Sequence, residues 1–432
     1  MHKRITGTVA VAVVAAVTAG GLFLATRGGP TEHARELPHS STFGQVVATP
    51  RFFNRLQMMD SAVGWAQFQS NEEGLPSQII RTEDGAQTWR NVSPALPGGE
   101  TIHQAFFLDT AHAWVLIDDV TAASPPLLPT RISRGAWTAD AGKTWTESAP
   151  VGISTPVPPL GSDLLMITFA DSQHGWVRDN AGTLFRTTDS GNTWHRISVS
   201  SGTNSQPVTG HLPASCSAGL TFRDSSQGYA AGTCPNDSSG LPLFFRSENA
   251  GASWTRQSLP LPGNAQQSVG GCQCVVSLPS FPTPSDGFVA LWSPIPMGAS
   301  HSAATSWQRT VYASHDGGRT WQVIGAPHTG DAYLGMVRFV DAMHGWLVDS
   351  TQDSARSFRT VDGGLTWQQL PGDQFLAPLN FTSPTEGWAL SVDASGPWGV
   401  IHSVDGGETW QPVVPGQTDP RAPAFSTPPP GK

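Results

Sequence analysis

Hydrophobic and polar positions alternate along most of the chain in a pattern that recurs. In one representative stretch, an apolar segment ends at Phe169, a polar turn precedes Gly175, residues 183–187 alternate, residues 189–192 are rich in turn formers, and residues 194–199 alternate again. Short alternating runs bounded by Gly, Asp, Asn and Ser are typical of β-strands joined by tight turns. The pattern predicts a unit of four short antiparallel strands.

An eight-residue motif, Ser/Thr-x-Asp-x-Gly-x-Thr/Ser-Trp, lies in the last turn of each unit. It occurs seven times, at a mean spacing of about 54 residues. Asp accepts backbone N–H groups inside its own turn, Gly tolerates positive φ, and Trp supplies apolar packing surface. We therefore interpret the acidic position as structural and not catalytic; it is filled by Asp84, Asp140, Asp189, Asn249, Asp316, Asp362 and Asp405.

A second element, Gly followed by an aromatic residue, precedes each copy of this motif, as in Gly175-Trp176 and Gly345-Trp346. It also occurs seven times, with small variations, and the two elements alternate strictly. Equal spacing indicates one structural unit repeated seven times. Four strands in each of seven units predict an all-β seven-bladed β-propeller over residues 45–414, in which the ring is the folding unit.

Composition narrows the fold class in the same direction. The 46 Gly and 36 Pro among 432 residues argue against a helical bundle, and 38% hydrophobic residues argue against a disordered chain. The net charge of −9 gives no sign of the basic surface that a nucleic-acid-binding protein would need. Twelve of the 16 Trp fall in the two repeated elements, so the Trp content is mainly blade architecture.

The N-terminal segment determines the expected compartment. Residues 5–26 carry no charge and would span about 33 Å as a helix, enough to cross a membrane. A cleaved signal peptide and a retained anchor compete, and the lack of a convincing cleavage site favours the anchor. Basic residues 1–4 would form a cytoplasmic stub, so the rest is expected outside the cytoplasm. We expect a linker over 27–44 and a disordered Pro-rich tail over 415–432.

Four cysteines lie between the fourth and fifth units, and outside the cytoplasm they favour disulfides. Cys216 and Cys234 flank one predicted hairpin symmetrically, so they are expected to face each other, which leaves Cys272 for Cys274. In the alternative pairing, Cys216 or Cys234 forms a disulfide with Cys272 or Cys274 and links two blades covalently. A zinc site is disfavoured because C-x-C is not the usual C-x2-C spacing. We expect no metal and no cofactor.

The eight-residue motif matches the Asp-box, or BNR repeat, found in sialidases, other glycoside hydrolases and sortilin-type receptors. The pairing of F-x-D-x-x-x-G-W with R-T-x-D-G-G-x-T-W most resembles the photosystem II assembly-factor family, over about residues 50–414. This resemblance implies a non-enzymatic propeller that binds a membrane-protein client. The identity of the client does not carry over, because a repeat is specific for fold and much less so for function.

The resemblance also implies a partner-binding surface rich in Arg. Four arginines directly precede an Asp-box, and the competing interpretation is that they bridge strands or pair with nearby acids. Two Trp bracket the longest insertion, in the fifth unit, and are candidate surface-binding aromatics. The candidate partner-binding residues are Arg81, Arg186, Arg246, Arg359, Trp292 and Trp307.

An enzyme is the alternative, as a carbohydrate-binding or glycoside-hydrolysing, sialidase-like propeller. A sialidase site needs an Arg clamp, a Tyr nucleophile with a Glu, and an Asp acid/base. The early R-I-P signature of that family is absent, and only Tyr333 of the three Tyr lies outside a repeated element or predicted strand. A two-carboxylate glycosidase stays open, because a sequence does not measure carboxylate separations. The favoured expectation is a non-enzymatic protein-binding propeller.

Overall fold

The computed structural model describes most of the repeated region of the chain. The described residues are 35–47, 53–68, 77–97, 100–119, 130–148, 153–156, 166–178, 183–198, 212, 216–234, 241–260, 274–295, 306–325, 329–330, 334–350, 355–371, 375–391 and 399–414. The expected stub, membrane segment and tail, together with Cys272 and Tyr333, lie outside them. No helix in the described part of the chain is long and apolar enough to cross a membrane.

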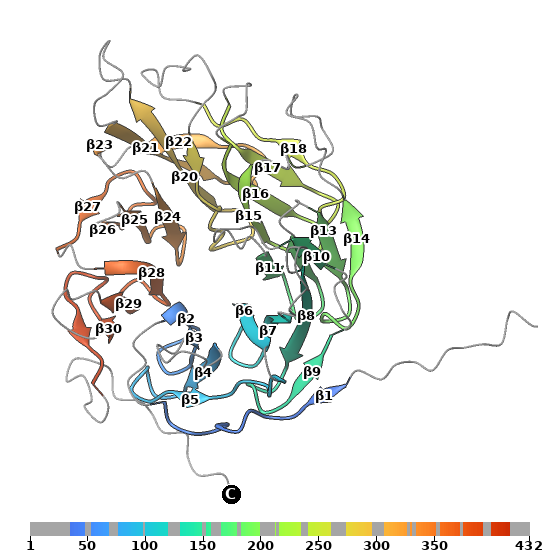
Figure 1. Ribbon diagram of the computed structural model, residues 1–432. Coiled ribbons are helices and arrows are strands. Elements are labelled where there is room, and N and C mark those ends of the chain that lie inside the picture. Colours follow the sequence, from blue (N-terminus) through green and yellow to red (C-terminus); the bar gives the residue numbers. More distant parts are fainter. Residues whose placement is uncertain are drawn as a thin grey trace, which may run out of the picture. The chain divides into compact units, whose positions relative to one another are not determined.

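Seven antiparallel sheets, one for each repeat, form the blades of a ring (Figure 1). The first three consist of β2 (Phe53–Met58), β3 (Gly64–Phe68), β4 (Gln78–Thr82) and β5 (Arg90–Asn91); β6 (Glu100–Phe107), β7 (Ala113–Asp119), β8 (Thr130–Thr138) and β9 (Trp145–Glu147), with β10 (Ile153–Pro156) on β8; and β11 (Met166–Phe169), β12 (Gly175–Arg178), β13 (Leu184–Thr187) and β14 (His195–Ser198).

The other four blades repeat this order. They consist of β15 (Ser217–Phe222), β16 (Gly228–Thr233), β17 (Phe244–Ser247) and β18 (Thr255–Arg256); β19 (Val275–Val276), β20 (Gly287–Ile295), β21 (Ser306–Ser314) and β22 (Gln322–Gly325), with β23 (Thr329–Gly330) on β21; β24 (Leu334–Phe339), β25 (Gly345–Ser350), β26 (Ala355–Thr360) and β27 (Gln368–Gln369); and β28 (Phe375–Phe381), β29 (Gly387–Ser391), β30 (Gly399–Ser403) and β31 (Gln411–Pro412).

The first strand of each blade faces the centre of the ring. Strand β11 lies beside both β6 and β15, and β2 of blade 1 lies beside β28 of blade 7, which closes the circle (Figure 1). The all-β seven-bladed propeller predicted from the repeats is therefore confirmed.

The aromatic residue after each Gly joins its blade to the next one. Trp176 is fully buried, stacks on Phe222 of blade 4 at 3.5 Å between ring centroids, and donates its indole N–H to the Ala250 carbonyl at 2.8 Å. The preceding Gly175 leaves room for Phe169, because a Cβ there would lie 2.4 Å from that ring. Trp114 and Trp346 make the same two contacts with their following blades. These residues bury a large apolar area between blades.

Residues 36–47 belong to the ring. Strand β1 (Glu36–Leu37) pairs with the outer strand β9, and Val46 bridges Arg90 at the edge of β5 (Figure 1). The linker expected over 27–44 is therefore wrong for residues 36–44. The outer strands present unpaired backbone groups, and this segment satisfies some of them.

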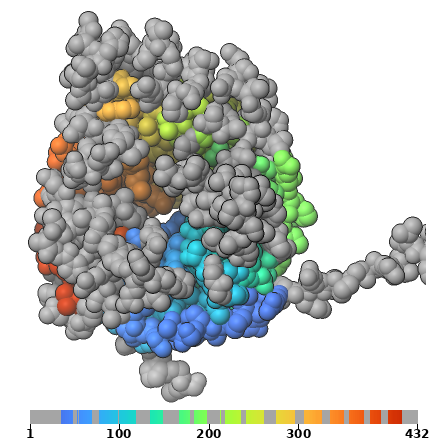
Figure 2. All heavy atoms as spheres, viewed as in Figure 1, coloured from blue at the N-terminus to red at the C-terminus, as the bar shows by residue number. Residues whose placement is uncertain are grey.

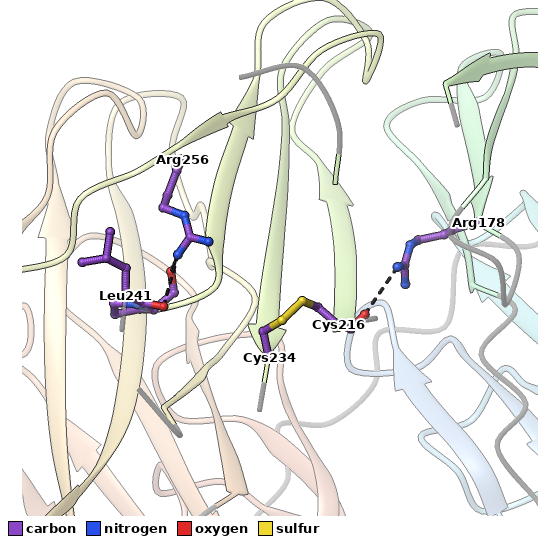
Figure 3. Close-up of a disulfide and its surroundings, with 6 residues drawn as sticks. Arg178, Cys216, Cys234, Leu241 and Arg256 are labelled. Carbon is purple, nitrogen blue, oxygen red and sulfur yellow. Dashed lines mark hydrogen bonds between the residues drawn. A yellow bond between two sulfur atoms is a disulfide. The ribbon is translucent and has the colours of Figure 1, made fainter. Parts of the chain in front are cut away.

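A disulfide joins Cys216 to Cys234 in blade 4 (Figure 3). The two residues directly flank the Ser217–Thr233 pair, so this is the pairing that the symmetric spacing predicts. Beside it, Arg178 of blade 3 donates to the Cys216 carbonyl at 3.4 Å (Figure 3). Cys274 is also disulfide-bonded.

Candidate functional site

The seven eight-residue motifs, which we call the boxes, use their carboxylates within their own turns. In blade 6, the Thr360 hydroxyl donates to Asp362 Oδ1 at 2.8 Å and accepts the Gly364 N–H at 2.9 Å. Thr366 donates its backbone N–H to Oδ1 and its hydroxyl to Oδ2 of the same Asp. The other boxes repeat this arrangement, with Asn249 taking the place of Asp in blade 4.

These hydrogen bonds lower the pKa of four of the box carboxyls, those of Asp140, Asp189, Asp316 and Asp362. The Thr366 hydroxyl and N–H lower the pKa of Asp362 to about 2. For Asp140, partial burial raises the pKa, but the hydrogen bonds from Thr144, Thr138 and Lys143 outweigh it and the net pKa is lowered. A carboxyl with a lowered pKa is a poor general acid near neutral pH. This supports the structural interpretation of the boxes.

Each box packs against the turn between the first two strands of its own blade. In blade 6 the Gly363 N–H donates to the Met343 carbonyl at 2.9 Å, and in blade 1 Gly85 donates to Ala62. Equivalent bonds occur in the other five blades. We call the face formed by the seven boxes and these turns the box face.

Three of the four arginines that precede a box donate to carbonyls of the following blade. Arg81 donates to Thr110, Arg186 to Ser225 and Arg359 to Asp405, at 3.1–3.2 Å. Arg246, only 8% exposed, pairs with Glu248 at 2.8 Å inside its own blade.

These arginines also lie against the aromatic residues of the second strands. Strand register places Arg81 opposite Trp65 and Arg186 opposite Trp176, with the guanidinium carbons 5.3 and 5.9 Å from the ring centroids. Because their guanidinium groups are committed to these contacts, the exposed Arg patch implied by the resemblance is not built from them. The contacts of these arginines fit the competing interpretation, in which they bridge strands or pair with nearby acids.

Of the two candidate surface Trp residues, one is fully buried and the other is partly exposed. Trp292 is fully buried, and its indole N–H donates to Asp349 Oδ1 of blade 6 at 3.0 Å. The same Asp forms a buried ion pair with Arg309. Trp307 is partly buried and packs in the cluster between blades 5 and 6. The surface-binding interpretation is wrong for Trp292, because β20 and β21 extend further than expected and carry both Trp residues on paired strands.

Two of the three Tyr are held in the core. Tyr229 and Tyr312 are fully buried, and their hydroxyls donate to the Gly317 and Pro260 carbonyls at 2.8 and 2.7 Å. Burial raises both pKa values, which keeps the phenols neutral and unsuited to nucleophilic attack. Among the described residues, no three His, Cys, Asp or Glu side chains are grouped to hold a metal ion.

Three exposed aliphatic side chains lie in box 6 and in the turn that packs against it. They are 49–66% exposed, and we call them the blade-six apolar patch: Met343, Val361 and Leu365. The Gly363 N–H donates to the Met343 carbonyl, which holds the box against this turn. Val323 of blade 5 is also exposed, but it lies opposite Tyr312, whose side chain faces blade 4.

The binding residues expected from the sequence do not include this patch, although the sequence carries a signal for it. The second and sixth positions of the other boxes are mostly polar or small, as in Glu83 and Gln87 or His315 and Arg319. Box 6 alone places large aliphatic residues at both positions, Val361 and Leu365.

Comparisons with known proteins show the fold. No protein-family model matches the chain, and no curated protein matches it. Solved structures do: YCF48 from Cyanidioschyzon merolae is 16% identical over 86% of this chain and 98% of that one, with a TM-score of 0.47. YCF48 bound to a D1 peptide is 16% identical over 85% and 97%, with a TM-score of 0.46. The GH74 xyloglucanase from Xanthomonas campestris is 13% identical over 88% and 56%, with a TM-score of 0.54.

Proposed function

We propose that this chain is a non-enzymatic, membrane-anchored propeller outside the cytoplasm that binds a protein partner, as an assembly or stability factor for an envelope complex. The blade-six apolar patch carries the proposal. Apolar side chains gathered on a surface mark sites of protein–protein or membrane contact more often than scattered ones do. Among the described residues, three of the seven exposed large hydrophobic side chains lie in this one place.

The chemistry of the patch favours a protein partner over a sugar. Sugars are commonly held by aromatic rings and by convergent polar groups, whereas the exposed large hydrophobic residues of the described chain are Val, Leu and Met. Aliphatic side chains and the flexible thioether of Met343 suit an apolar protein segment that packs against them. We therefore expect the partner to present apolar side chains to Leu365 and Val361.

Membrane attachment and the compartment rest on the sequence. Residues 5–26 are uncharged and long enough to span a bilayer, and the Cys216–Cys234 disulfide fits an oxidising compartment. Alkaline carbonate extraction of membranes, with N-terminal sequencing of the mature chain, tests the anchor. Release into the soluble fraction, or a mature N-terminus after residue 26, would refute it.

Partner binding is tested by affinity capture from detergent-solubilised membranes with the full chain. We expect one membrane protein to be enriched with the wild type and lost with Leu365→Glu. The matched control is Leu241→Glu, which alters an exposed Leu of blade 4 outside the patch. Equal enrichment by all three proteins would show that the patch is not the binding site.

A carbohydrate function is the alternative, and one feature favours testing it. A polar hollow of about 250 Å³ in blade 4 is lined by Arg246, Glu248, Asn249, Ser253, Thr255 and Gln257. A glycan array and a panel of aryl glycosides would detect binding or hydrolysis there. No signal from the wild type in either assay would remove this alternative, and a signal lost in Glu248→Gln would place it in this hollow.

A further inference from the structure

The outer strands of the first two blades each pair with an extended segment of the same chain. In blade 1, Asn91 of β5 donates its N–H to the Gln45 carbonyl at 3.0 Å and accepts the Gly44 N–H at 2.7 Å. In blade 2, β1 pairs antiparallel with β9. Figure 2 shows the blue atoms of this N-terminal segment along the outer rim of the ring. Outer strands of this propeller therefore bind short extended segments through backbone hydrogen bonds.

Strand register identifies the residue of blade 5 that corresponds to Asn91. Asn91 lies opposite Ile80, which is two residues before box 1. Val323 of β22 lies opposite Tyr312, which is two residues before box 5. In an antiparallel sheet the backbone groups of successive residues point to alternate sides of the strand, so equal register gives equal direction. The N–H and C=O of Val323 therefore point away from blade 5, and we call this place in each blade the outward position.

Val323 differs from the residues at the outward position of the remaining blades. Those residues are Glu147, Arg196, Arg256, Gln369 and Pro412. Charged residues and Pro at a sheet edge hinder pairing with a further strand, and Gln369 lies in a strand of only two residues. Strand β22 has four residues and no charge, and Val323 is 51% exposed. Within the described part of the chain, β22 pairs only with β21, so its outer edge is open.

The end of β22 lies against box 6, which carries the blade-six apolar patch. A Cβ on Gly325 would lie 2.6 Å from the Gly364 carbonyl oxygen and 3.6 Å from that of Leu365. The Leu365 side chain is 66% exposed. A strand added beside β22 would run about 4.8 Å from it, so a segment that pairs with Val323 and continues past Gly325 arrives at Leu365. The open edge and the apolar patch therefore form one continuous surface.

We propose that the outer edge of β22 binds an extended segment of the protein partner as an additional antiparallel strand, with apolar side chains at alternate positions. The proposal rests on the protein-binding function proposed above and specifies how the partner is held. Backbone hydrogen bonds to Val323 supply affinity, and side chains packed on Leu365 supply specificity. A partner segment is favoured over a second copy of the ring, because the segments that pair with β5 and β9 are extended chain and not another blade.

Random peptides of about ten residues, displayed on phage and selected on the immobilised full chain, provide the probe. The selected peptides, made synthetically, should bind Val323→Pro about tenfold more weakly than the wild type, because the peptide carbonyl that faced the lost N–H stays unpaired. Pro412 occupies the outward position of blade 7, so the fold tolerates Pro there. Methylation of every second backbone nitrogen of the peptide should weaken binding in one phase and not in the other, since only alternate N–H groups face β22.

A matched variant and an exchange measurement separate the edge of β22 from other effects. Arg196→Pro makes the same backbone change at the outward position of blade 3 and should bind the peptides as the wild type does. Val323→Ala keeps the N–H and should weaken binding less than Val323→Pro. In the unbound chain, the Val323 amide hydrogen should exchange faster than that of Asn91, which is bonded to Gln45. Saturating peptide should slow the exchange at Val323.

Four results would overturn the proposal. The first is that no selected peptide depends on the edge: none is obtained, or Val323→Pro binds them as well as Arg196→Pro does. The second is a Val323 amide that already exchanges as slowly as that of Asn91 in the unbound chain. The third is a wild-type dimer, measured by light scattering, that Val323→Pro converts to a monomer, because a second copy would then be the occupant. The fourth is peptide binding that is unchanged when either set of alternate nitrogens is methylated.

The failure of this proposal and the failure of the proposed function give different results. If the membrane protein captured by the wild type is lost with Leu365→Glu but kept with Val323→Pro, the patch binds a partner without strand pairing, so the function stands and the proposal is overturned. If the peptides depend on Val323 but no membrane protein is captured, strand addition at β22 is supported and the function as an envelope assembly factor fails.

Discussion

The ion pair between Arg309 and Asp349 offers the sharpest test of how blades 5 and 6 are joined. Its side chains are 0% and 1% exposed, and the Arg309 Nε and Asp349 Oδ2 atoms lie 2.5 Å apart. The other carboxylate oxygen accepts the indole N–H of Trp292. Asp349→Asn keeps an acceptor for Trp292 but removes the negative charge that lies against the buried guanidinium of Arg309.

Breaking one side of a buried ion pair costs about 3–5 kcal/mol, because the remaining charge is not solvated. An unfolding entropy of about 2.1 cal/mol/K per residue, applied to the ring, converts this cost into a fall of roughly 4–6 °C in melting temperature. The double variant Arg309→Met with Asp349→Asn removes both charges and keeps the acceptor. It should recover most of the loss, because an apolar side chain of similar length replaces the ion.

Urea titration and thermal melting of the two variants and the wild type measure these differences. Glu83→Gln is the control, because Glu83 pairs with Arg81 but its side chain is 74% exposed, and we expect a change below about 1 kcal/mol. If Asp349→Asn costs as little as this control, the burial argument fails. If the double variant is no more stable than Asp349→Asn, the cost does not come from the unpaired charge.

Three further predictions concern the rest of the ring. Replacing Cys216 and Cys234 by Ala should lower the free energy of unfolding by about 3 kcal/mol, since the bond closes a short loop, and any remaining effect of reductant on the melting temperature should come only from the disulfide of Cys274. The folded-state pKa of Asp362 is lowered to about 2 from an unfolded value near 3.9, so the contribution of Asp362 to stability is present above about pH 4 and lost as the pH falls toward 2. The pKa values of several other Asp residues of the box face are lowered too, so the urea midpoint should fall steeply between pH 4 and pH 2. A urea midpoint that does not change over this range would contradict the argument. Trp176→Ala should lower the free energy of unfolding by about 3–5 kcal/mol, because it removes the side chain that stacks on Phe222, and Trp176→Phe should lower it less. Equal losses for the two variants in chemical denaturation would show that the volume of the indole does not determine the cost.

Local features were readable from the sequence because they depend on residues close together in the chain. The box turns follow from the Thr-x-Asp spacing, since the side chains of Thr360, Asp362 and Thr366 bond to one another and to the backbone between them. The blades follow from period-two alternation, and their number follows from counting the repeats. The Cys216–Cys234 bond follows from hairpin symmetry.

Contacts between residues of different blades could not be predicted from the sequence in this way. Whether Arg81 faces solvent or the next blade depends on a carbonyl 29 residues away, at Thr110. Trp292 was expected at the surface, but Asp349 lies 57 residues further along the chain and covers its indole nitrogen. Residues 36–44 have the composition of a linker, and only the exposed edges of β5 and β9 make them part of the fold.

The sequence alone therefore determined the architecture of this protein, because each blade is specified by a short-range code repeated seven times. The tertiary structure alone decided which surfaces are available for binding. Closing the ring buried Trp292 and Arg246, partly buried the other three arginines that the motifs had marked, and left aliphatic side chains exposed at the blade-six apolar patch. The physical reason is that contacts between blades join residues that no local pattern relates, and burial and charge are properties of those contacts.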